Sequence, residues 1–202
     1  ARPNFMKIAP IVHELIKEKE FFDFALIHTG QHYDKNMSDT FFEQLEIPKP
    51  TLNLGIGKGS HAAQIGQTMI EFEKYLLSNK TDMVIVVGDV NATIACALTA
   101  SKLNIPVAHV EAGLRSFDRT MPEEINRLAT DAISDLLFTP SEDANIQLKK
   151  EGVQDDKIVF IGNIMIDTLL HQREKAKATN YYKSLDLTEK KYILLTLHRP
   201  SN

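Results

Sequence analysis

The sequence has little of what marks several specialised protein classes. Its single cysteine, Cys96, excludes an intrachain disulfide and fits a reducing, cytoplasmic setting. No apolar run approaches the roughly 20 residues of a membrane-spanning helix, and residues 1–4 lack the apolar region of a signal peptide. The 202 residues include 23 Lys and Arg against 27 Asp and Glu, and this acidic excess argues against a dedicated nucleic-acid binder. What remains is a globular chain of one to two domains.

Motifs of common nucleotide-dependent enzymes and hydrolases are also absent. The sequence holds no G-x-x-x-x-G-K-[ST] phosphate loop, no G-x-G-x-x-G opening a helix and no G-x-S-x-G elbow. A P-loop NTPase is thereby excluded, and a NAD-binding domain is disfavoured. The run 55–60 is rich in glycine and precedes a helix, so it is either a phosphate cradle or a flexible loop.

Short apolar segments alternate with amphipathic ones along the chain. This alternation predicts an α/β fold with a doubly wound parallel sheet, in which ligands bind beyond the carboxyl ends of the strands. The predicted strands are 83–87, 106–110, 136–138, 158–161 and 192–197, with 22–28 as a further candidate.

Helices are predicted between these strands from apolar periodicity and capping residues. Ser60 and Ser141 have the character of N-caps, Pro122 that of a first helical residue and Gly152 that of a residue just past a helix end. The predicted helices are 6–20, 61–79, 92–103, one beginning at 122, and one from 142 to about 151.

Both ends of the chain depart from a regular doubly wound domain. The chain opens on a polar loop and a helix without a preceding strand, and 192–197 is a strand with no later partner. We therefore expect one domain over 1–180 that lacks its first strand. Residues 181–202 are expected to be a linker and the first strand of a second domain.

Polar groups follow several of the predicted strands. Arg2 and Lys7 lie where a loop enters a helix, which indicates either an anion site or a solvated helix start. Gln31 and His32 follow the candidate strand 22–28 and are candidate substrate contacts, since His28 and His32 lack a third clustered ligand for a metal.

Carboxylates follow two strands that we expect to be neighbours. Asp89 follows 83–87 and Glu111 ends 106–110, so both should meet at one sheet edge, where mutual repulsion would raise the pKa of one of them. An N-cap role for Asp89 is the alternative. Glu123 and Arg127 are four residues apart on a predicted helix, spaced for substrate contacts or for a surface ion pair.

Taken in order, these motifs resemble the non-hydrolysing UDP-N-acetylglucosamine 2-epimerases over essentially the whole chain. The resemblance rests on the following residues: Arg2-Pro3 with Lys7, Gln31-His32, Gly88-Asp89, the run from His109 to Arg115, Pro122-Glu123-Glu124 with Asn126-Arg127, Gly162-Asn163 with Asp167, and His198-Arg199.

The resemblance implies the first half of a GT-B-like architecture, with the active site between two doubly wound domains. It implies interconversion of UDP-N-acetylglucosamine and UDP-N-acetylmannosamine through a 2-acetamidoglucal, for surface polysaccharide synthesis. It also implies that no metal or other cofactor is needed, that the full-length protein is a cytoplasmic homodimer without nucleic-acid or membrane partners, and that this portion alone is inactive. The implied catalytic residues are Asp89, Glu111 and Glu123, and the implied substrate contacts are Arg2, Lys7, Gln31, His32, Arg127 and His198.

Some positions depart from the family pattern, and other functions stay open. Asn4 stands where many members have Glu, Ala1 where Thr is usual, and 200–202 replaces a common Arg-Glu-Asn ending. The 55–61 loop also differs, which leaves an activating second UDP-N-acetylglucosamine site undecided. The alternatives are an epimerase of another UDP-2-acetamido sugar, a GT-B-like glycosyltransferase and a non-catalytic UDP-sugar-binding module.

Overall fold

The computed structural model describes residues 2–30 and 35–196, and the chain divides into two units, 1–168 and 169–202. The first unit contains all strands of the described part of the chain, and every one of its strand pairs is parallel. The strands are β1 (Ile27–His28), β2 (Leu52–Asn53), β3 (Val84–Val87), β4 (Val107–Val110), β5 (Leu136–Thr139) and β6 (Ile158–Phe160).

The strands form two hydrogen-bonded sheets rather than the single sheet predicted. β1 pairs with β2, and the other four strands form a sheet in the order β3-β4-β5-β6. β1 is only two residues long, because the rest of the candidate strand 22–28 makes little pairing: Leu26 exchanges bonds with Thr51, and Phe22 is exposed. The four-stranded sheet matches the predicted strands closely.

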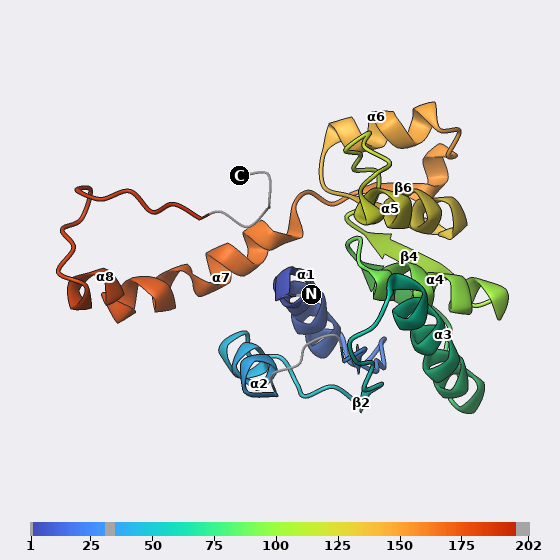
Figure 1. Ribbon diagram of the computed structural model, residues 1–202, viewed down its shortest axis with the longest axis horizontal. Helices are drawn as coiled ribbons and strands as arrows, with labels where there is room; N and C mark the ends of the chain where they lie inside the picture. The colour runs from blue at the N-terminus through green and yellow to red at the C-terminus, as the bar shows by residue number, and fades with distance from the viewer. Residues whose placement is uncertain (1, 31–34, 197–202) are drawn as a thin grey trace. The chain divides into compact units, whose positions relative to one another are not determined.

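Helices account for most of the remaining regular structure of both units, and Figure 1 labels them along the chain. The helix predicted over 6–20 begins and ends earlier, at Arg2 and Lys17. Three helices, α2, α7 and α8, were not predicted from the sequence. The helices are α1 (Arg2–Lys17), α2 (Lys35–Gln44), α3 (His61–Ser78), α4 (Asn91–Lys102), α5 (Pro122–Ile133), α6 (Glu142–Lys150), α7 (Ile164–Thr179) and α8 (Tyr181–Ser184), with a 3-10 turn at Asp155–Lys157.

The capping residues behave largely as predicted. Ser60 Oγ accepts from the Ala63 amide at 3.2 Å, so the glycine-rich 55–60 run ends in a helix cap. Ser141 Oγ accepts from the Ala144 amide at 3.3 Å, and Pro122 is the first residue of α5. Gly152, with φ of +89°, follows the last turn of α6 as a left-handed terminator.

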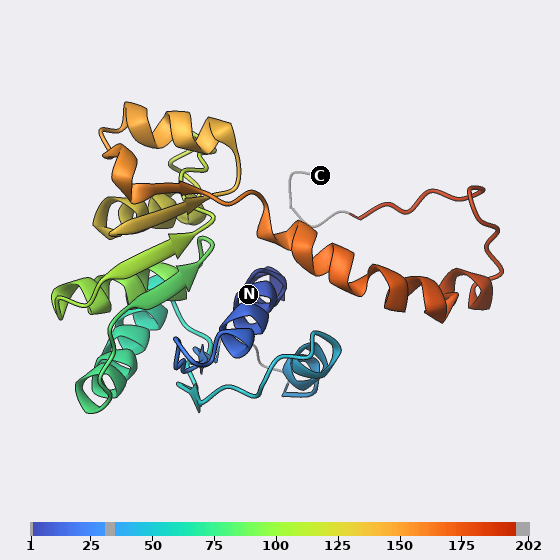
Figure 2. The ribbon, with the colours of Figure 1, turned by 180° about the vertical axis from the view of Figure 1, so that it is seen from behind.

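One apolar cluster lies between helices α3 and α4 and the sheet, and a second lies between helices α1 and α2. α3 and α4 lie side by side and enclose, with β3 and β4, a core of Phe72, Leu76, Val86, Ala97 and Val107. The views in Figures 1 and 2 agree on this arrangement and on α5 beside α4. A second cluster, formed by α1, α2 and the residues around β1, includes Phe5, Val12, Phe42, Leu45 and Ile47.

The second unit has no strand among its described residues. The strand predicted over 192–197 is wrong for 192–196, which have no regular structure, and residue 197 lies outside the described part. A strand needs hydrogen bonds to a neighbouring strand, and no described strand pairs with this segment, in which Ile193, Leu194 and Leu195 are exposed. No helix in 2–30 or 35–196 combines the length and apolarity needed to cross a membrane.

Candidate active site

The candidate site lies where β3 and β4 end. Val87 pairs with Val110, so Gly88 and Glu111 leave adjacent strands at the same edge, as predicted. Gly88 has φ of +71° and Glu111 has φ of +76°. The left-handed region is strained for a residue with a side chain, and such strain concentrates at functional positions. The backbone thus directs Glu111 away from the ordinary strand path.

Helix α1 supplies a cation to this edge. Lys7 is only 7% exposed, and its Nζ donates a hydrogen bond to Glu111 Oε2 within an ion pair. Asn4 Nδ2 donates to the Val87 carbonyl at 3.1 Å, which fixes the start of α1 against the end of β3. A Cβ at Gly88 would lie 3.0 Å from Asn4 Oδ1 and 3.2 Å from Lys7 Nζ, so a side chain here would crowd both residues at this close approach of the helix.

Helix α5 supplies the second cation. Arg127 Nη1 donates to Asp89 Oδ2 at 2.5 Å, and Arg127 Nη2 donates to Glu124 Oε2 at 2.7 Å. Asn126 Nδ2 donates to the Asp89 carbonyl at 2.9 Å. The two strand-end carboxylates, Asp89 and Glu111, therefore each face their own cation. The two cations offset the electrostatic repulsion that we expected between these carboxylates.

Glu124 is the partner of Arg127 that the sequence analysis missed. The predicted pairing of Glu123 with Arg127 is wrong, because Glu123 is exposed and Glu124 lies on the buried face of α5, three residues before the arginine. Glu124 also accepts from the backbone amides of Ser116 and Phe117, each at 3.0 Å. Burial alone would raise the pKa of Glu124, but these amides and Arg127 lower it to about 2. This carboxylate is fixed as an anion and anchors the loop before α5.

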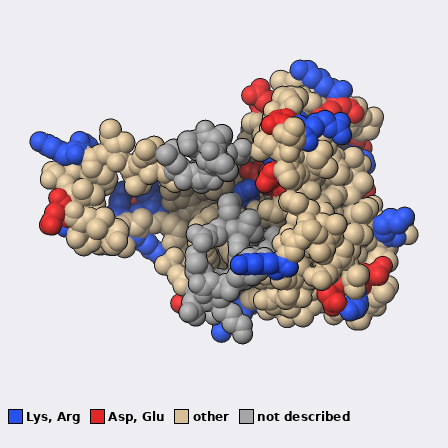
Figure 3. Space-filling view, in the orientation of Figure 1, with Lys and Arg blue, Asp and Glu red and all other residues tan. Residues whose placement is uncertain are grey.

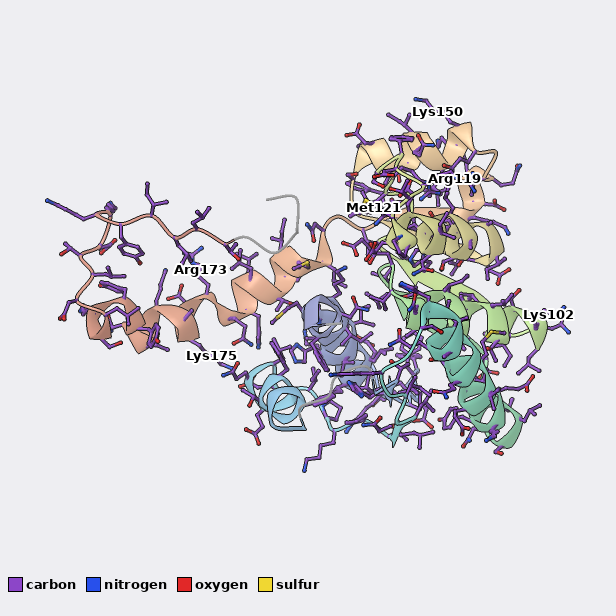
Figure 4. All side chains as sticks on the ribbon, in the orientation of Figure 1. Lys102, Arg119, Met121, Lys150, Arg173 and Lys175 are labelled. Atoms are coloured by element: carbon purple, nitrogen blue, oxygen red, sulfur yellow. The ribbon has the colours of Figure 1, made fainter. Side chains whose placement is uncertain are left out.

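The alternative role of Asp89 as a helix cap is not found. The N-cap position of α4 is Val90, and no side chain caps that helix. Asn91, its first residue, donates through Nδ2 to Gln64 Oε1 of α3 at 2.8 Å. Helix α4 runs from this edge of the sheet to Lys102, which Figure 4 labels at the far end of the helix. The same figure labels Arg119 and Met121 in the loop before α5, away from Lys102. The Asp89 side chain therefore pairs with Arg127 and does not cap α4.

Four predicted site residues have side chains that the structure does not describe. Gln31, His32 and His198 lie outside the described residues, and Arg2 begins α1 without a described side chain. Among the side chains that are described, no group of three His, Cys, Asp or Glu could hold a metal ion. His28 instead accepts a hydrogen bond from the Gly30 amide at 3.1 Å, and burial lowers its pKa.

A buried polar chain behind the strand ends was not predicted. His109 of β4 is fully buried, with Nε2 2.8 Å from the Gly88 carbonyl and Nδ1 2.6 Å from Asp131 Oδ1. Asp131 Oδ2 accepts from the Gly113 amide at 3.0 Å and from Arg115 Nη1 at 2.7 Å. The available signal was a histidine inside an apolar strand, but its partner is 22 residues away on another element.

Arg115 extends this chain to the surface. Its Nε and Nη2 donate to the two oxygens of Glu151 at 2.9 and 2.6 Å, a two-point pair that fixes the guanidinium plane. Burial opposes the charge of Arg115, but Glu151 and Asp131 raise its pKa. Burial likewise would raise the pKa of Asp131, yet His109 and Arg115 lower it. Arg115 therefore lies between two carboxylates, Asp131 and Glu151, and the three charges stabilise one another.

The fold and the site define an α/β protein with parallel strands, whose strand ends present carboxylates beside buried cations. The chain belongs to the UDP-N-acetylglucosamine 2-epimerase family, whose sequence model matches residues 14–202. This confirms the family that the motifs predicted.

Individual relatives agree with this assignment. A UDP-N-acetylglucosamine 2-epimerase homolog of Methanococcus maripaludis is 52% identical over 100% of this chain and 56% of its own length. A UDP-2,3-diacetamido-2,3-dideoxy-D-glucuronate 2-epimerase of Pseudomonas aeruginosa is 47% identical over 100% of this chain and 56% of its own. The chain thus spans just over half the length of these curated relatives.

A solved structure shows the same fold. The UDP-GlcNAc 2-epimerase of Methanocaldococcus jannaschii, in complex with UDP-GlcNAc and UDP, is 49% identical with a TM-score of 0.86. The match covers 91% of this chain and 50% of that one. The described fold is therefore half of a GT-B-like epimerase architecture, as the sequence predicted.

Proposed function

We propose that this chain is the amino-terminal part of a UDP-N-acetylglucosamine 2-epimerase. The observation that carries the proposal is the pair of strand-end carboxylates, Asp89 with Arg127 and Glu111 with Lys7, on one edge of a parallel sheet. Acid/base groups beside cations are what the reaction needs, since it moves a proton and expels a diphosphate. The family and the ligands of the Methanocaldococcus structure support the same substrate class.

The proposed reaction is an elimination followed by an addition. A carboxylate removes the proton from carbon 2 of the sugar, and the released electron pair forms the double bond to carbon 1. The bond from carbon 1 to the UDP oxygen breaks, and UDP leaves as an anion from a 2-acetamidoglucal. Return of a proton to the opposite face of carbon 2, with re-addition of UDP at carbon 1, gives the epimer.

Lys7 and Arg127 are the described cations placed for the departing diphosphate. Both are mostly buried, with side chains 9% and 13% exposed, so a phosphate would meet them without full competition from water. Lys7 is paired with Glu111, and Arg127 is paired with both Asp89 and Glu124. Protonation of a carboxylate during turnover would weaken its hold on the cation and free positive charge for the phosphate. Arg2, Gln31, His32 and His198 complete the proposed contacts.

Glu123 differs from the other two candidate acids. It lies in the first turn of α5, where the helix dipole favours an anion, and it is exposed with no cation partner among the described side chains. A solvent-facing carboxylate is suited to exchanging a proton with water or with a substrate that arrives there. We assign it to the catalytic set with Asp89 and Glu111.

One relative supports a second candidate substrate. The Pseudomonas relative, at 47% identity, is an epimerase of a UDP-diacetamido uronic acid. The proposal further includes the prediction of a cytoplasmic homodimer that supplies a surface-polysaccharide precursor, as the family resemblance implies.

The test is proton NMR of UDP-N-acetylglucosamine in deuterated water. It uses this chain alone and this chain extended at both ends to the full length of its relatives. The extended protein should form UDP-N-acetylmannosamine with deuterium at carbon 2, and the shorter chain should be inactive. Unchanged substrate would move the assay to the diacetamido uronic acid, and inactivity on both would contradict the proposal. UDP with free sugar would indicate a hydrolase, and sugar transfer to an added acceptor a glycosyltransferase.

A further inference from the structure

One buried group near the site has no role in the proposed reaction. The imidazole of His109 is fully buried in β4, although the other residues of this strand are apolar. Burying a polar ring costs free energy unless its nitrogens are hydrogen-bonded. The partners of His109 therefore show what the ring does.

Both ring nitrogens of His109 face hydrogen-bond acceptors. Nε2 lies 2.8 Å from the Gly88 carbonyl oxygen, which carries no hydrogen. Nδ1 lies 2.6 Å from Asp131 Oδ1, and the other Asp131 oxygen accepts from Arg115 at 2.7 Å. A carboxylate that already accepts from a guanidinium stays ionised, so it cannot donate to the ring. Both ring nitrogens therefore donate, and Nε2–H points at the Gly88 carbonyl.

The Gly88 carbonyl belongs to the peptide that carries Asp89. Gly88 has φ of +71° and no side chain, so neighbouring contacts must fix its conformation. Its amide donates to the Val110 carbonyl at 3.1 Å, and its carbonyl accepts from His109. These two bonds fix both ends of the residue. They orient the peptide plane between Gly88 and Asp89, and this plane sets the direction of the Asp89 side chain toward Arg127.

We propose that His109 is a positioning residue, whose Nε2–H holds the Gly88 carbonyl and thereby directs the Asp89 carboxylate into the site. His109 touches no reacting atom and acts through the Gly88–Asp89 peptide. In its effect on turnover, the inference rests on the proposed epimerase function.

Three substitutions distinguish the hydrogen bond from His109 to Gly88 from two other roles of His109: the charge of its ring and its contribution to folding. His109→Gln places an amide nitrogen near the Nε2 position, so it keeps the bond to Gly88 and loses the one to Asp131. His109→Asn places its amide near Nδ1 and does the reverse. Asp131→Asn can donate to Nδ1 of a neutral ring, so it removes the charge while Nε2–H stays on Gly88.

The kinetic experiment uses the extended protein, and each kcat is calculated from the concentration of folded protein. His109→Asn should lower kcat about 10- to 100-fold with an unchanged KM, because a misdirected catalytic group loses turnover rather than binding. His109→Gln and Asp131→Asn should lose only a few-fold. Wild-type kcat in His109→Asn would overturn the proposal. So would an equal loss in all three variants, which would assign the role to the ring charge.

A spectroscopic measurement on the chain itself needs no turnover. In the wild type, the ¹⁵N spectrum of the His109 ring should show hydrogen on both nitrogens, with Nε2–H protected from exchange. A ring without hydrogen on Nε2 would refute the proposal even if His109→Asn failed to fold. The Asp89 amide resonance should shift more in His109→Asn than in His109→Gln. Inactivity of the wild type with these signals intact would instead count against the epimerase function alone.

Discussion

The ends of β3 and β4 contrast with the ends of β5 and β6, although all four strands run parallel in one sheet. Val87, Val110, Phe138 and Val159 are matched across the sheet, so the four strands end at one edge. β3 and β4 are followed by carboxylates paired with Lys7 and Arg127. After β5 and β6, residues 140–141 and 161–163 carry no charged side chain.

The contrast shows that the sheet supplies an edge but not a site. After β5, Ser141 caps α6, and the helix then carries acidic residues in its first turn and basic ones in its last. Figure 3 shows acidic and basic side chains close together on the face over this region, where they are solvated. After β3 and β4, by contrast, the cations come from α1 and α5 and are buried. Chemistry concentrates where two helices deliver opposite charge to the strand ends.

The largest expected effect is on turnover. Glu111→Gln should lower the rate of the extended protein about 100- to 10,000-fold, because an amide cannot take or return a proton. Folding should stay intact, since the amide oxygen can still accept from Lys7. The NMR assay in deuterated water measures the loss, and circular dichroism checks the fold.

The matched control for Glu111→Gln lies at the other pair of strand ends. Glu142→Gln removes an exposed carboxylate from the first turn of α6, where it accepts from Asn145 Nδ2 at 3.1 Å. Its turnover should equal that of the wild type. Equal activity in both variants would remove Glu111 from the catalytic set and contradict the difference between the β3–β4 half and the β5–β6 half of the edge.

The next largest effect is on stability. Glu124→Gln should lower the free energy of unfolding by roughly 3 kcal/mol, because a buried charge partner of Arg127 is lost. Urea unfolding of both proteins at pH 7 measures the difference. The matched neighbour Glu123→Gln changes an exposed side chain and should stay within about 0.5 kcal/mol. A similar cost for both would contradict the distinct burial of the two glutamates.

The contribution of Glu124 also depends on pH in a defined direction. Its pKa in the folded protein is lowered to about 2 from an ordinary value of 4.5. The folded state therefore gains stability that is fully present above about pH 4.5 and is lost as pH falls toward 2. The stability gap between wild type and Glu124→Gln should narrow across this acid range and stay constant above it.

Gly88 and Gly162 allow steric crowding to be compared between the β3–β4 half and the β5–β6 half of the sheet edge. Gly88 and Gly162 have φ of +71° and +79°, so alanine is strained at either position by about 1–2 kcal/mol. At Gly88 the new methyl would also meet Asn4 and Lys7, whereas nothing lies within 4 Å at Gly162. Gly88→Ala should therefore cost about 1–3 kcal/mol more than Gly162→Ala.

Urea unfolding of the two alanine variants, with the Asn4 side-chain amide followed by NMR, tests this difference. Only Gly88→Ala should move the Asn4 resonance, because Asn4 Nδ2 is bonded to the neighbouring Val87 carbonyl. Equal costs at both positions would show that the approach of α1 to β3 is loose.

The sequence predicted the fold better than it predicted the partners within the site. Apolar runs identified four strands, and serine caps identified the starts of α3 and α6, because these signals are local. The partner of Arg127 was misassigned to Glu123, since helical spacing allows both i+3 and i+4 pairs and only burial selects Glu124. The bond from His109 to Asp131 joins residues 22 positions apart, which no local pattern encodes.

The smallest expected effect belongs to the uncharged edge. Ser141 Oγ accepts from the Ala144 amide at 3.3 Å and caps α6. Ser141→Ala should cost about 1 kcal/mol in urea unfolding, the usual value of a lost N-cap. It should leave turnover of the extended protein unchanged, because no group of the proposed reaction follows β5. A loss of turnover would place part of the site at the β5 end, and the division of the sheet edge into a charged and an uncharged half would then fail.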